Sequence, residues 1–440
     1  MLDVFGGRWD VRLAALCSLV FLFVASIPGT IALRYMLQAI LLVLVIIFQR
    51  DTLARLWSES RWPTIWLGAF VGFGALHCAL IAFWPGYAWQ EFRSQLIVGL
   101  LWFVIGWGVF RRPGNVSILD QVIIAGSGLS LAEFLIEAWH WHHDGVWPFM
   151  VTFMTDTHLE FTLFANMVLA CIGVALIFRR ACYVPHSRLP AWLLAVLCVL
   201  IVFVSLRVAA RNGMLGLLAL LGQLTVLGLW FETKRVGVKR ILAVGVLALA
   251  AIGVLGGYAF KQDARNQVLI GSLNAGWNYQ QSDQWLDSSA PLPTLPDGRQ
   301  ADESAYRRLA WFHRGLRLIV GHPMGFGYGR DAFGLALLHE GYKTYPSTNA
   351  HSGVIDLGIR LGVPGILLWT AYCLSLVVIG YRAFTARGDL RGLVLLLLSC
   401  GHMARMMIES IQRDHMLYLF LFISAGLLAE ISARRVPLPD

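Results

Sequence analysis

Charged residues are scarce in this sequence. Only 14% of its 440 residues are Asp, Glu, Lys or Arg, whereas 58% are hydrophobic and the mean hydropathy is +0.66. A soluble globular domain carries far more charged surface than this, so that class of protein is excluded. Apolar runs of roughly 18–22 residues recur along the chain instead, and each is long enough to cross the hydrocarbon core of a bilayer. The composition predicts a polytopic helical membrane protein.

Cysteine is absent from the one long polar segment, residues 261–350. All cysteines except Cys182, which lies in a short basic loop, fall inside apolar runs. This distribution gives no indication of a disulfide framework or a thiolate metal site. The first apolar run also lacks a small-residue cleavage site, so we interpret it as a retained helix rather than as a cleaved signal.

The apolar runs define twelve expected membrane spans and therefore an all-α fold. They cover residues 12–27, 30–48, 63–83, 93–110, 118–138, 159–178, 190–206, 212–231, 240–260, 354–381, 392–408 and 414–431. Lys and Arg gather in the short connections on one side, whereas the connections near 27–29, 84–90 and 139–158 contain none. Because cytoplasmic loops carry such an excess, we expect both termini in the cytoplasm. The expected organisation is nine helices in residues 1–260, an outer loop at 261–350 and three helices in 351–440.

Some arginines lie on the side that this charge rule leaves without positive charge. Arg207 and Arg211 flank one short outer turn, and Arg405 and Arg413 flank another. Long translocated loops carry charge freely, but tight turns do not. Arginine is suited to binding phosphate through its fixed fork of donors. The two turns therefore predict an anionic partner outside the membrane, although arginines at helix ends also extend to lipid headgroups.

The outer loop contains an expected amphipathic helix at about residues 302–320. A helical wheel places the apolar residues on one face and the charged ones on the opposite face. The apolar face consists of Ala305, Leu309, Phe312, Leu316, Ile319 and Val320, and the polar face of Glu303, Arg307, Arg314 and Arg317. Such a helix would lie along the membrane surface or cover a cavity.

His351 lies where the polar loop meets the tenth expected span. Ser347, Thr348 and Asn349 are good N-cap residues, so His351 is expected just inside the start of the helix. The positive end of that helix would favour a neutral imidazole, which is the form that a general base requires, and would attract phosphate. The alternative is that His351 only caps and anchors the helix at the interface.

Other polar groups carry weaker signals. A tract of His140, His142, His143 and Asp144 could hold a metal, but its neighbouring tryptophans favour interfacial packing. The glycines at 325, 327 and 329 lack the strand and lysine of a nucleotide site. Glu133 and Glu137 suit either proton coupling or a cavity lining. Arg34 and Arg93 are best explained as interfacial or structural charges.

The stretch from His351 resembles a known family signature. His351-Ser352, nine further residues and Gly362-Val-Pro-Gly365 resemble the His-[Asn/Ser/Gln]-x9-Gly-x-x-Gly motif of the O-antigen ligases and the wider polymerase and ligase superfamily. The run from Arg307 to Phe333 is similar to the segment upstream of that histidine. Arg211 matches an arginine at the outer start of a membrane helix, and Arg265 matches one early in the periplasmic loop.

The resemblance implies a metal-independent, inverting glycosyltransferase with a GT-C-like membrane fold and no cofactor. Such an enzyme moves O-antigen from undecaprenyl pyrophosphate to a sugar hydroxyl of lipid A-core, at the periplasmic face of the bacterial inner membrane. Its partners are these two lipids and the membrane, with no nucleic acid. By resemblance His351 would deprotonate the acceptor, and Arg211 and Arg265 would hold the pyrophosphate. The arginines expected to contact phosphates on donor or acceptor also include Arg207, Arg307, Arg308 and Arg314, while Asp414 could orient His351 or an arginine.

Three alternatives remain open at this point. An O-antigen polymerase shares the topology, and a protein O-oligosaccharyltransferase shares the motif region but usually carries additional sequence after it. A lipid or glycan transporter would also be polytopic with intramembrane charges. It would need polar residues through the depth of the bundle, whereas the unexplained charges here cluster on one side.

Overall fold

The structure is a computed structural model that describes residues 9–48, 50–111, 116–178, 187–208, 211–232, 267–345 and 347–433, with residues 246, 250, 253, 254 and 257. Helices dominate this part of the chain, and its only β-type pairing is one isolated bridge between Thr294 and Gln300. The described chain is therefore all-α, as the apolar periodicity predicts.

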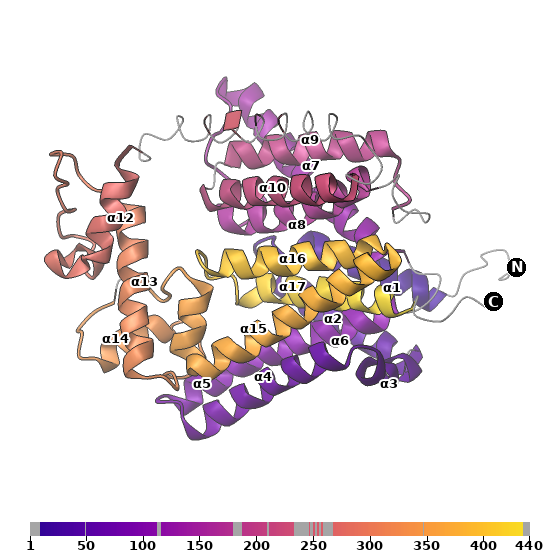
Figure 1. The fold of residues 1–440 in the computed structure, drawn as a ribbon, viewed down its shortest axis with the longest axis horizontal. Coiled ribbons are helices and arrows are strands. Elements are labelled where there is room, and N and C mark those ends of the chain that lie inside the picture. The colour runs from indigo at the N-terminus through magenta and orange to yellow at the C-terminus, as the bar shows by residue number, and fades with distance from the viewer. Residues whose placement is uncertain are drawn as a thin grey trace, which may run out of the picture.

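The helices follow one another along the whole described chain (Figure 1). The first group is α1 (Trp9–Val24), α2 (Ile31–Phe48), α3 (Arg50–Glu59), α4 (Arg61–Leu80), α5 (Pro85–Phe92), α6 (Val98–Phe110), α7 (Ile118–Asp144), α8 (His158–Ile177), α9 (Ala191–Val208) and α10 (Arg211–Glu232). The second group is α12 (Leu269–Trp277), α13 (Glu303–Gly321), α14 (Ala332–His339), α15 (Gly353–Arg387), α16 (Leu390–Met406) and α17 (Asp414–Ala433).

Eight described helical segments are long and apolar enough to cross a membrane, which makes this a polytopic membrane protein. They are α2, α4, the continuous stretch Pro85–Phe110, α7, α8, α9, α15 and α17. Helices also occupy the expected spans at 12–27, 212–231 and 392–408, but α1 has 16 residues and α16 has 17. The expected span 240–260 lies almost entirely outside the described residues. The number twelve stays a prediction.

Two stretches expected as connections are helical. Residues 84–90 begin α5, which continues through one π-helical turn at Arg93–Ile97 into α6. The His tract at 140–144 forms the last turn of α7, which ends at Gly145 in a left-handed conformation. Propensity alone places the ends of long apolar helices poorly, because polar interfacial residues continue a helix as readily as they end it.

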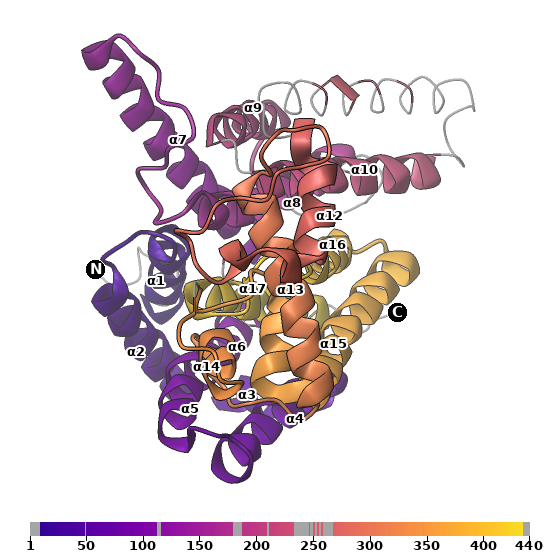
Figure 2. The same ribbon diagram turned by 90° about the vertical axis from the view of Figure 1, so that its left-hand side faces the viewer.

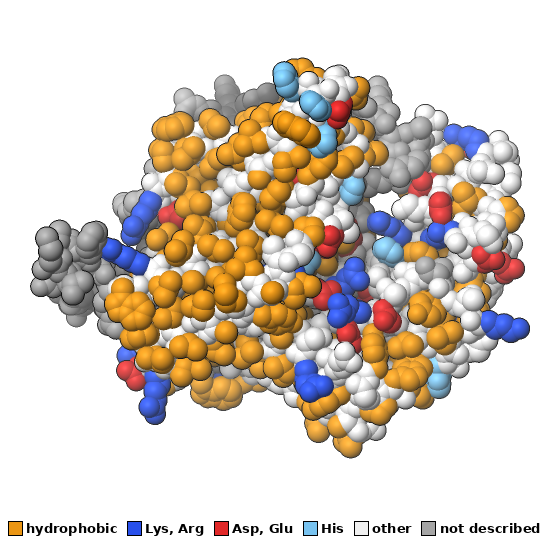
Figure 3. Space-filling view, turned by 180° about the vertical axis from the view of Figure 1, so that it is seen from behind, with side chains coloured by type: hydrophobic (Ala, Val, Ile, Leu, Met, Phe, Trp, Pro, Cys, Tyr) orange, Lys and Arg blue, Asp and Glu red, His pale blue; other side chains and the backbone are white. Residues whose placement is uncertain are grey.

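The centre of the bundle is α17, most of whose residues are buried. It packs closely against α6 because Gly106 leaves room for its backbone: a Cβ at that glycine would collide with the Phe422 carbonyl oxygen. Hydrophobic side chains cover the flank of the bundle, and charged ones gather toward its ends (Figure 3). That distribution fits a bundle surrounded by lipid along its length.

A second hydrophobic core lies at one end of the bundle, where α12, α13 and α14 sit (Figures 1 and 2). The buried face of α13 includes Tyr306, Ala310, Trp311 and Leu318, while Val320 is 81% exposed. The apolar face expected from the wheel is therefore wrong in part. The large aromatic residues decide the orientation, because burying them against α12 and α15 removes the most apolar surface from water.

The long helix α15 is interrupted at Gly362, which has a φ of +67° and a ψ of −169°. The interruption exposes the backbone groups of one turn, and the extended segment 323–327 bonds to them. Phe326 N–H donates to the Ile359 carbonyl at 2.7 Å, and Gly327 N–H donates to the Arg360 carbonyl at 3.0 Å. Val363 N–H donates to the Pro323 carbonyl at 2.8 Å. The segment thus replaces hydrogen bonds that an unbroken helix would make itself.

Gly362→Ala tests whether this interruption requires glycine. A Cβ at Gly362 would collide with the Pro323 carbonyl oxygen, and its positive φ disfavours other residues. We expect the free energy of unfolding in detergent to fall by about 2–4 kcal/mol, from strain and overpacking together. The matched control is Gly68→Ala in α4, where a Cβ meets nothing within 4 Å and stability should hold or rise slightly. Equal stability of both variants would contradict this role for Gly362.

Candidate functional site

His351 lies in a tight turn immediately before α15, not inside the helix as expected. The N-cap is Ser352, whose Oγ accepts a hydrogen bond from Ile355 N–H, and the helix begins at Gly353. His351 has a positive φ of 53°, which few residues other than glycine adopt. Its backbone N–H donates to Asn349 Oδ1 at 3.1 Å. Asn349 therefore holds the turn that presents His351 and does not cap α15.

This turn is fastened to the α16–α17 connection. Ser410 Oγ donates to Asn349 Oδ1 at 3.0 Å and is also hydrogen bonded to the buried Asp356 carboxylate. The same carboxylate accepts from Ala350 N–H at 2.7 Å. Gly353 N–H donates to the Glu409 carbonyl at 2.9 Å. A buried polar network in which each member has a partner is rigid, so these contacts fix the position of His351.

The imidazole of His351 stacks on Trp311 of α13, with ring centroids 5.2 Å apart and planes 18° from parallel. Burial, together with the positive charges of Arg308 and Arg413, lowers the pKa of His351 to about 4. The ring is therefore neutral at physiological pH and has a lone pair free to accept a proton. The imidazole is therefore neutral, as expected. Desolvation and the positive charges of two arginines keep it so, because both disfavour the protonated form.

The structure brings Arg308 and Arg413 to His351 from two different elements. Arg308 lies on α13 three residues before Trp311, a spacing that places both side chains on one helical face. Arg413 lies in the connection before α17. Arg308 was expected to bind phosphate, whereas Arg413 was noted only as a charge on the wrong side of the membrane. That misplaced charge is the sequence signal that could have identified it.

Three other arginines expected to bind phosphate contact groups within the protein. Arg307 pairs with Glu303 at 2.6 Å and donates to Gln284 at 3.2 Å. Arg314 pairs with Glu340 at 3.3 Å and lies over the Tyr342 ring. Arg207 donates to the carbonyls of Trp147 and Pro148, and its Nε lies 3.9 Å from Glu137 Oε2.

Arg211 and Arg265 cannot be placed in the same way. Arg211 is the first residue of α10, but its side chain is outside the described part of the structure, as is the whole of Arg265. The start of α10 does lie against α8, because Asn166 donates to the Gly213 carbonyl at 3.4 Å. The start of α8 in turn binds Arg405 through Thr162 at 2.7 Å. The first turn of α10 is therefore at the same end of the bundle as the α16–α17 connection.

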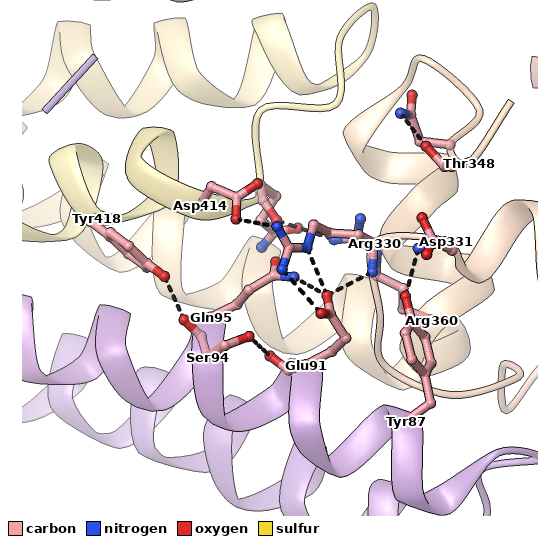
Figure 4. Close-up of polar contacts among 12 residues, drawn as sticks. Tyr87, Glu91, Ser94, Gln95, Arg330, Asp331, Thr348, Arg360, Asp414 and Tyr418 are labelled. Carbon is pink, nitrogen blue, oxygen red and sulfur yellow. Dashed lines mark hydrogen bonds and ion pairs between the residues drawn. The ribbon is translucent and has the colours of Figure 1, made fainter. Parts of the chain in front are cut away.

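Asp414 lies against Arg330 (Figure 4). Arg330 Nη1 is 3.2 Å from Asp414 Oδ1, while its Nε and Nη2 contact the two oxygens of Glu91 at 3.0 and 3.1 Å. Glu91 also accepts from Gln95 Nε2 at 2.6 Å. The carboxylates raise the pKa of Arg330, chiefly through the hydrogen bonds that Glu91 accepts from it. This ion-pair network joins the loop before α14 to α5 and α17.

The polar groups at the far end of α7 serve packing. His140 Nδ1 lies 3.2 Å from Asp144, and its ring stacks on Phe153. Across the residues that the structure describes, no group of three His, Cys, Asp or Glu side chains is arranged to hold a metal. Glu133 accepts from the N–H groups of Phe153 and Met154, and Glu137 accepts from the Trp147 indole. Both carboxylates therefore hold the loop that follows α7.

A double-mutant cycle on Glu91 and Arg330 measures the strength of the network. Glu91 is buried, so we expect Glu91→Gln and Arg330→Met to be non-additive, with a coupling of about 1–3 kcal/mol in unfolding free energy. The matched control is the exposed pair Arg299 and Asp297, which are 2.6 Å apart and should couple more weakly, because solvent screens an exposed ion pair. A coupling no larger than that of the control would show that the network does not hold the loop.

The comparison with protein families agrees with this arrangement of residues. Residues 196–370 match the family model described as O-antigen ligase, a family of glycosyltransferase-like enzymes. The match extends from α9 through α13 and His351 to the interruption of α15. No curated protein matches the chain. The match supports the assignment of residues 196–370 to the O-antigen ligase family.

Proposed function

We propose that this protein transfers O-antigen from undecaprenyl pyrophosphate to a sugar hydroxyl of lipid A-core, at the periplasmic face of the inner membrane. The observation that carries the proposal is a neutral His351, which lies inside the family match in a turn of positive φ and is acted on by the charges of Arg308 and Arg413. A neutral imidazole can accept a proton, and guanidinium groups can stabilise phosphate charge. The proposal includes the N-in, C-in orientation, the twelve-helix GT-C-like fold and the outer loop at 261–350.

In the proposed reaction His351 takes the proton of the acceptor hydroxyl. The hydroxyl oxygen attacks the anomeric carbon of the donor glycan, and the bond from that carbon to the phosphate oxygen breaks. Undecaprenyl pyrophosphate leaves with the electron pair, and the anomeric configuration is inverted. Arg211 and Arg265 are proposed to hold the leaving pyrophosphate, because stabilising developing charge is usually a large part of catalysis. No metal or other cofactor enters this proposal, since the donor already carries a good leaving group.

The contacts of the other arginines support phosphate binding to different degrees. Arg308 acts on His351 directly, which supports contact with substrate. Arg307 and Arg314 are held by Glu303 and Glu340, so each would have to exchange a carboxylate for a phosphate. Arg207 is engaged by the loop after α7, which favours a supporting role. Asp414 is proposed to orient Arg330 rather than His351.

Transfer with purified components tests the reaction. The full chain in detergent or nanodiscs is mixed with undecaprenyl-pyrophosphate O-antigen and lipid A-core, without ATP or divalent metal. We expect glycosylated lipid from wild type and a rate lower by about 10²–10⁴-fold from His351→Ala. The matched control is His142→Ala, an exposed histidine at the end of α7, which should retain full activity.

Each other outcome of this assay has a distinct meaning. Full activity of folded His351→Ala would refute the base assignment. A strict requirement for metal, together with loss of activity in His142→Ala, would instead support a role for the His140–Asp144 tract. Lengthening of the glycan on its carrier, with none moved to lipid A-core, would identify a polymerase.

The pH dependence of kcat/KM tests the state of His351. The base must be neutral, so activity should fall as pH drops through its pKa, near 4 in the free enzyme. Arg308→Met removes a positive charge that lowers this pKa, so the pKa should rise and the acid limb should move to higher pH. The matched control is Arg317→Met on the same helix, which should leave the limb in place. A limb that stays fixed in Arg308→Met would show that a different group titrates.

A further inference from the structure

Arg308 and Arg413 act on His351 from two different elements. On one side, Trp311 stacks on the imidazole, and Arg308 precedes it by three residues on α13. On the other side, Ser410 bonds to Asn349, which holds His351, and Arg413 follows Ser410 in the same connection. Both guanidinium groups act electrostatically on the imidazole. The two positive charges therefore lie close to the proposed base itself.

Arg413 differs from four other arginines at this end of the bundle. Arg307, Arg314, Arg330 and Arg405 each pair with a carboxylate. Across the described ranges, no carboxylate pairs with Arg413 and no side-chain hydrogen bond engages it, although its Nε is buried. A buried donor without a partner is costly, and such groups in proteins usually have one. The geometry leaves the guanidinium of Arg413 available for a ligand group.

The stereochemistry of the proposed reaction indicates which of the two substrates Arg413 would bind. In an inverting transfer the acceptor oxygen and the leaving pyrophosphate lie on opposite sides of the anomeric carbon. The base contacts the acceptor hydroxyl, so groups beside the base face the acceptor, and the pyrophosphate is on the far side of the reacting carbon. Guanidinium groups adjacent to His351 are thus placed to hold the acceptor.

We propose that Arg413, with Arg308, binds a phosphate monoester of the acceptor lipid close to the hydroxyl that is glycosylated. This inference rests on the proposed function and adds an acceptor specificity to it. Arginine forms a bidentate pair with phosphate, which would orient the acceptor as well as attract it. The orientation would place the hydroxyl against the imidazole and lower the KM for the acceptor.

Equilibrium binding tests the site independently of catalysis. The full chain in nanodiscs is titrated with intact lipid A-core, with the same lipid after enzymatic removal of the lipid A phosphates, and after removal of all phosphates by cold hydrofluoric acid. Wild type should bind the fully dephosphorylated lipid about ten- to hundred-fold more weakly than the intact lipid. The enzymatically treated sample shows whether the phosphate comes from lipid A or from the core sugars, and either source supports the site.

Variants test whether Arg413 is responsible for the tighter binding of the phosphorylated lipid. Arg413→Met should bind all three lipids with the weak affinity that wild type shows for the phosphate-free one. Arg413→Lys should recover part of the difference, because lysine keeps the charge but lacks the fork. Arg317→Met should behave as wild type. In transfer assays Arg413→Met should raise the KM for intact acceptor and leave the KM for the donor unchanged.

Three results would overturn the inference. Wild type could bind phosphorylated and phosphate-free lipids equally, Arg413→Met could weaken both equally, or Arg413→Met could raise the KM for the donor instead. Failure of the proposed function is distinguishable from these. If wild type binds intact lipid in an Arg413-dependent manner but transfers nothing to it, the transfer reaction is wrong and the phosphate site stands.

Discussion

The interruption of α15 at Gly362 is the constraint on which the His351 end of this protein depends. An unbroken helix would keep its own hydrogen bonds and offer none to the segment 323–327. At the break, Ile359 and Arg360 accept bonds from that segment, which is also held by His77 through the Met324 carbonyl at 2.7 Å. Phe83 N–H donates to the Phe326 carbonyl at 2.9 Å. Backbone hydrogen bonds thereby tie the segment to α15 and to the α4–α5 connection, and the His77 side chain ties it to α4.

The candidate site follows from that attachment. Once residues 323–331 are fixed, α13 lies over the start of α15 and Trp311 reaches His351. The α16–α17 connection closes the other side through Ser410. Most charges here are paired within the protein, as in the Glu91–Arg330–Asp414 network. Arg413 stands apart from that pattern, because no carboxylate in the described ranges pairs with it, and we propose that it binds an anionic lipid beside the neutral imidazole.

Sequence patterns predicted the helices well but predicted their surroundings poorly. Apolar run length depends only on local composition, which is why the spans from 30–48 to 414–431 coincide with helices wherever the chain is described. The buried face of α13 depends on which other helices Tyr306 and Trp311 pack against. A helical wheel carries no information about those neighbouring helices. Four residues before α15 have side chains that suit an N-cap: Ser347, Thr348, Asn349 and Ser352. Only tertiary contacts determine that Ser352 is the one that caps the helix. The Gly-x-x-Gly motif was recognisable, but its structural reason, a helix break filled by a distant segment, was not.

The central claim is that lipid-linked glycan is transferred at the His351 end of the bundle. Photocrosslinking with an undecaprenyl pyrophosphate that carries a photoreactive sugar tests it most directly, because the adduct marks the residues beside the anomeric carbon. The account predicts adducts in residues 308–311, 349–352 and 410–413, suppressed by unlabelled donor. Adducts concentrated at residues 139–154, which form the end of α7 and the loop after it, with none near His351, would contradict it.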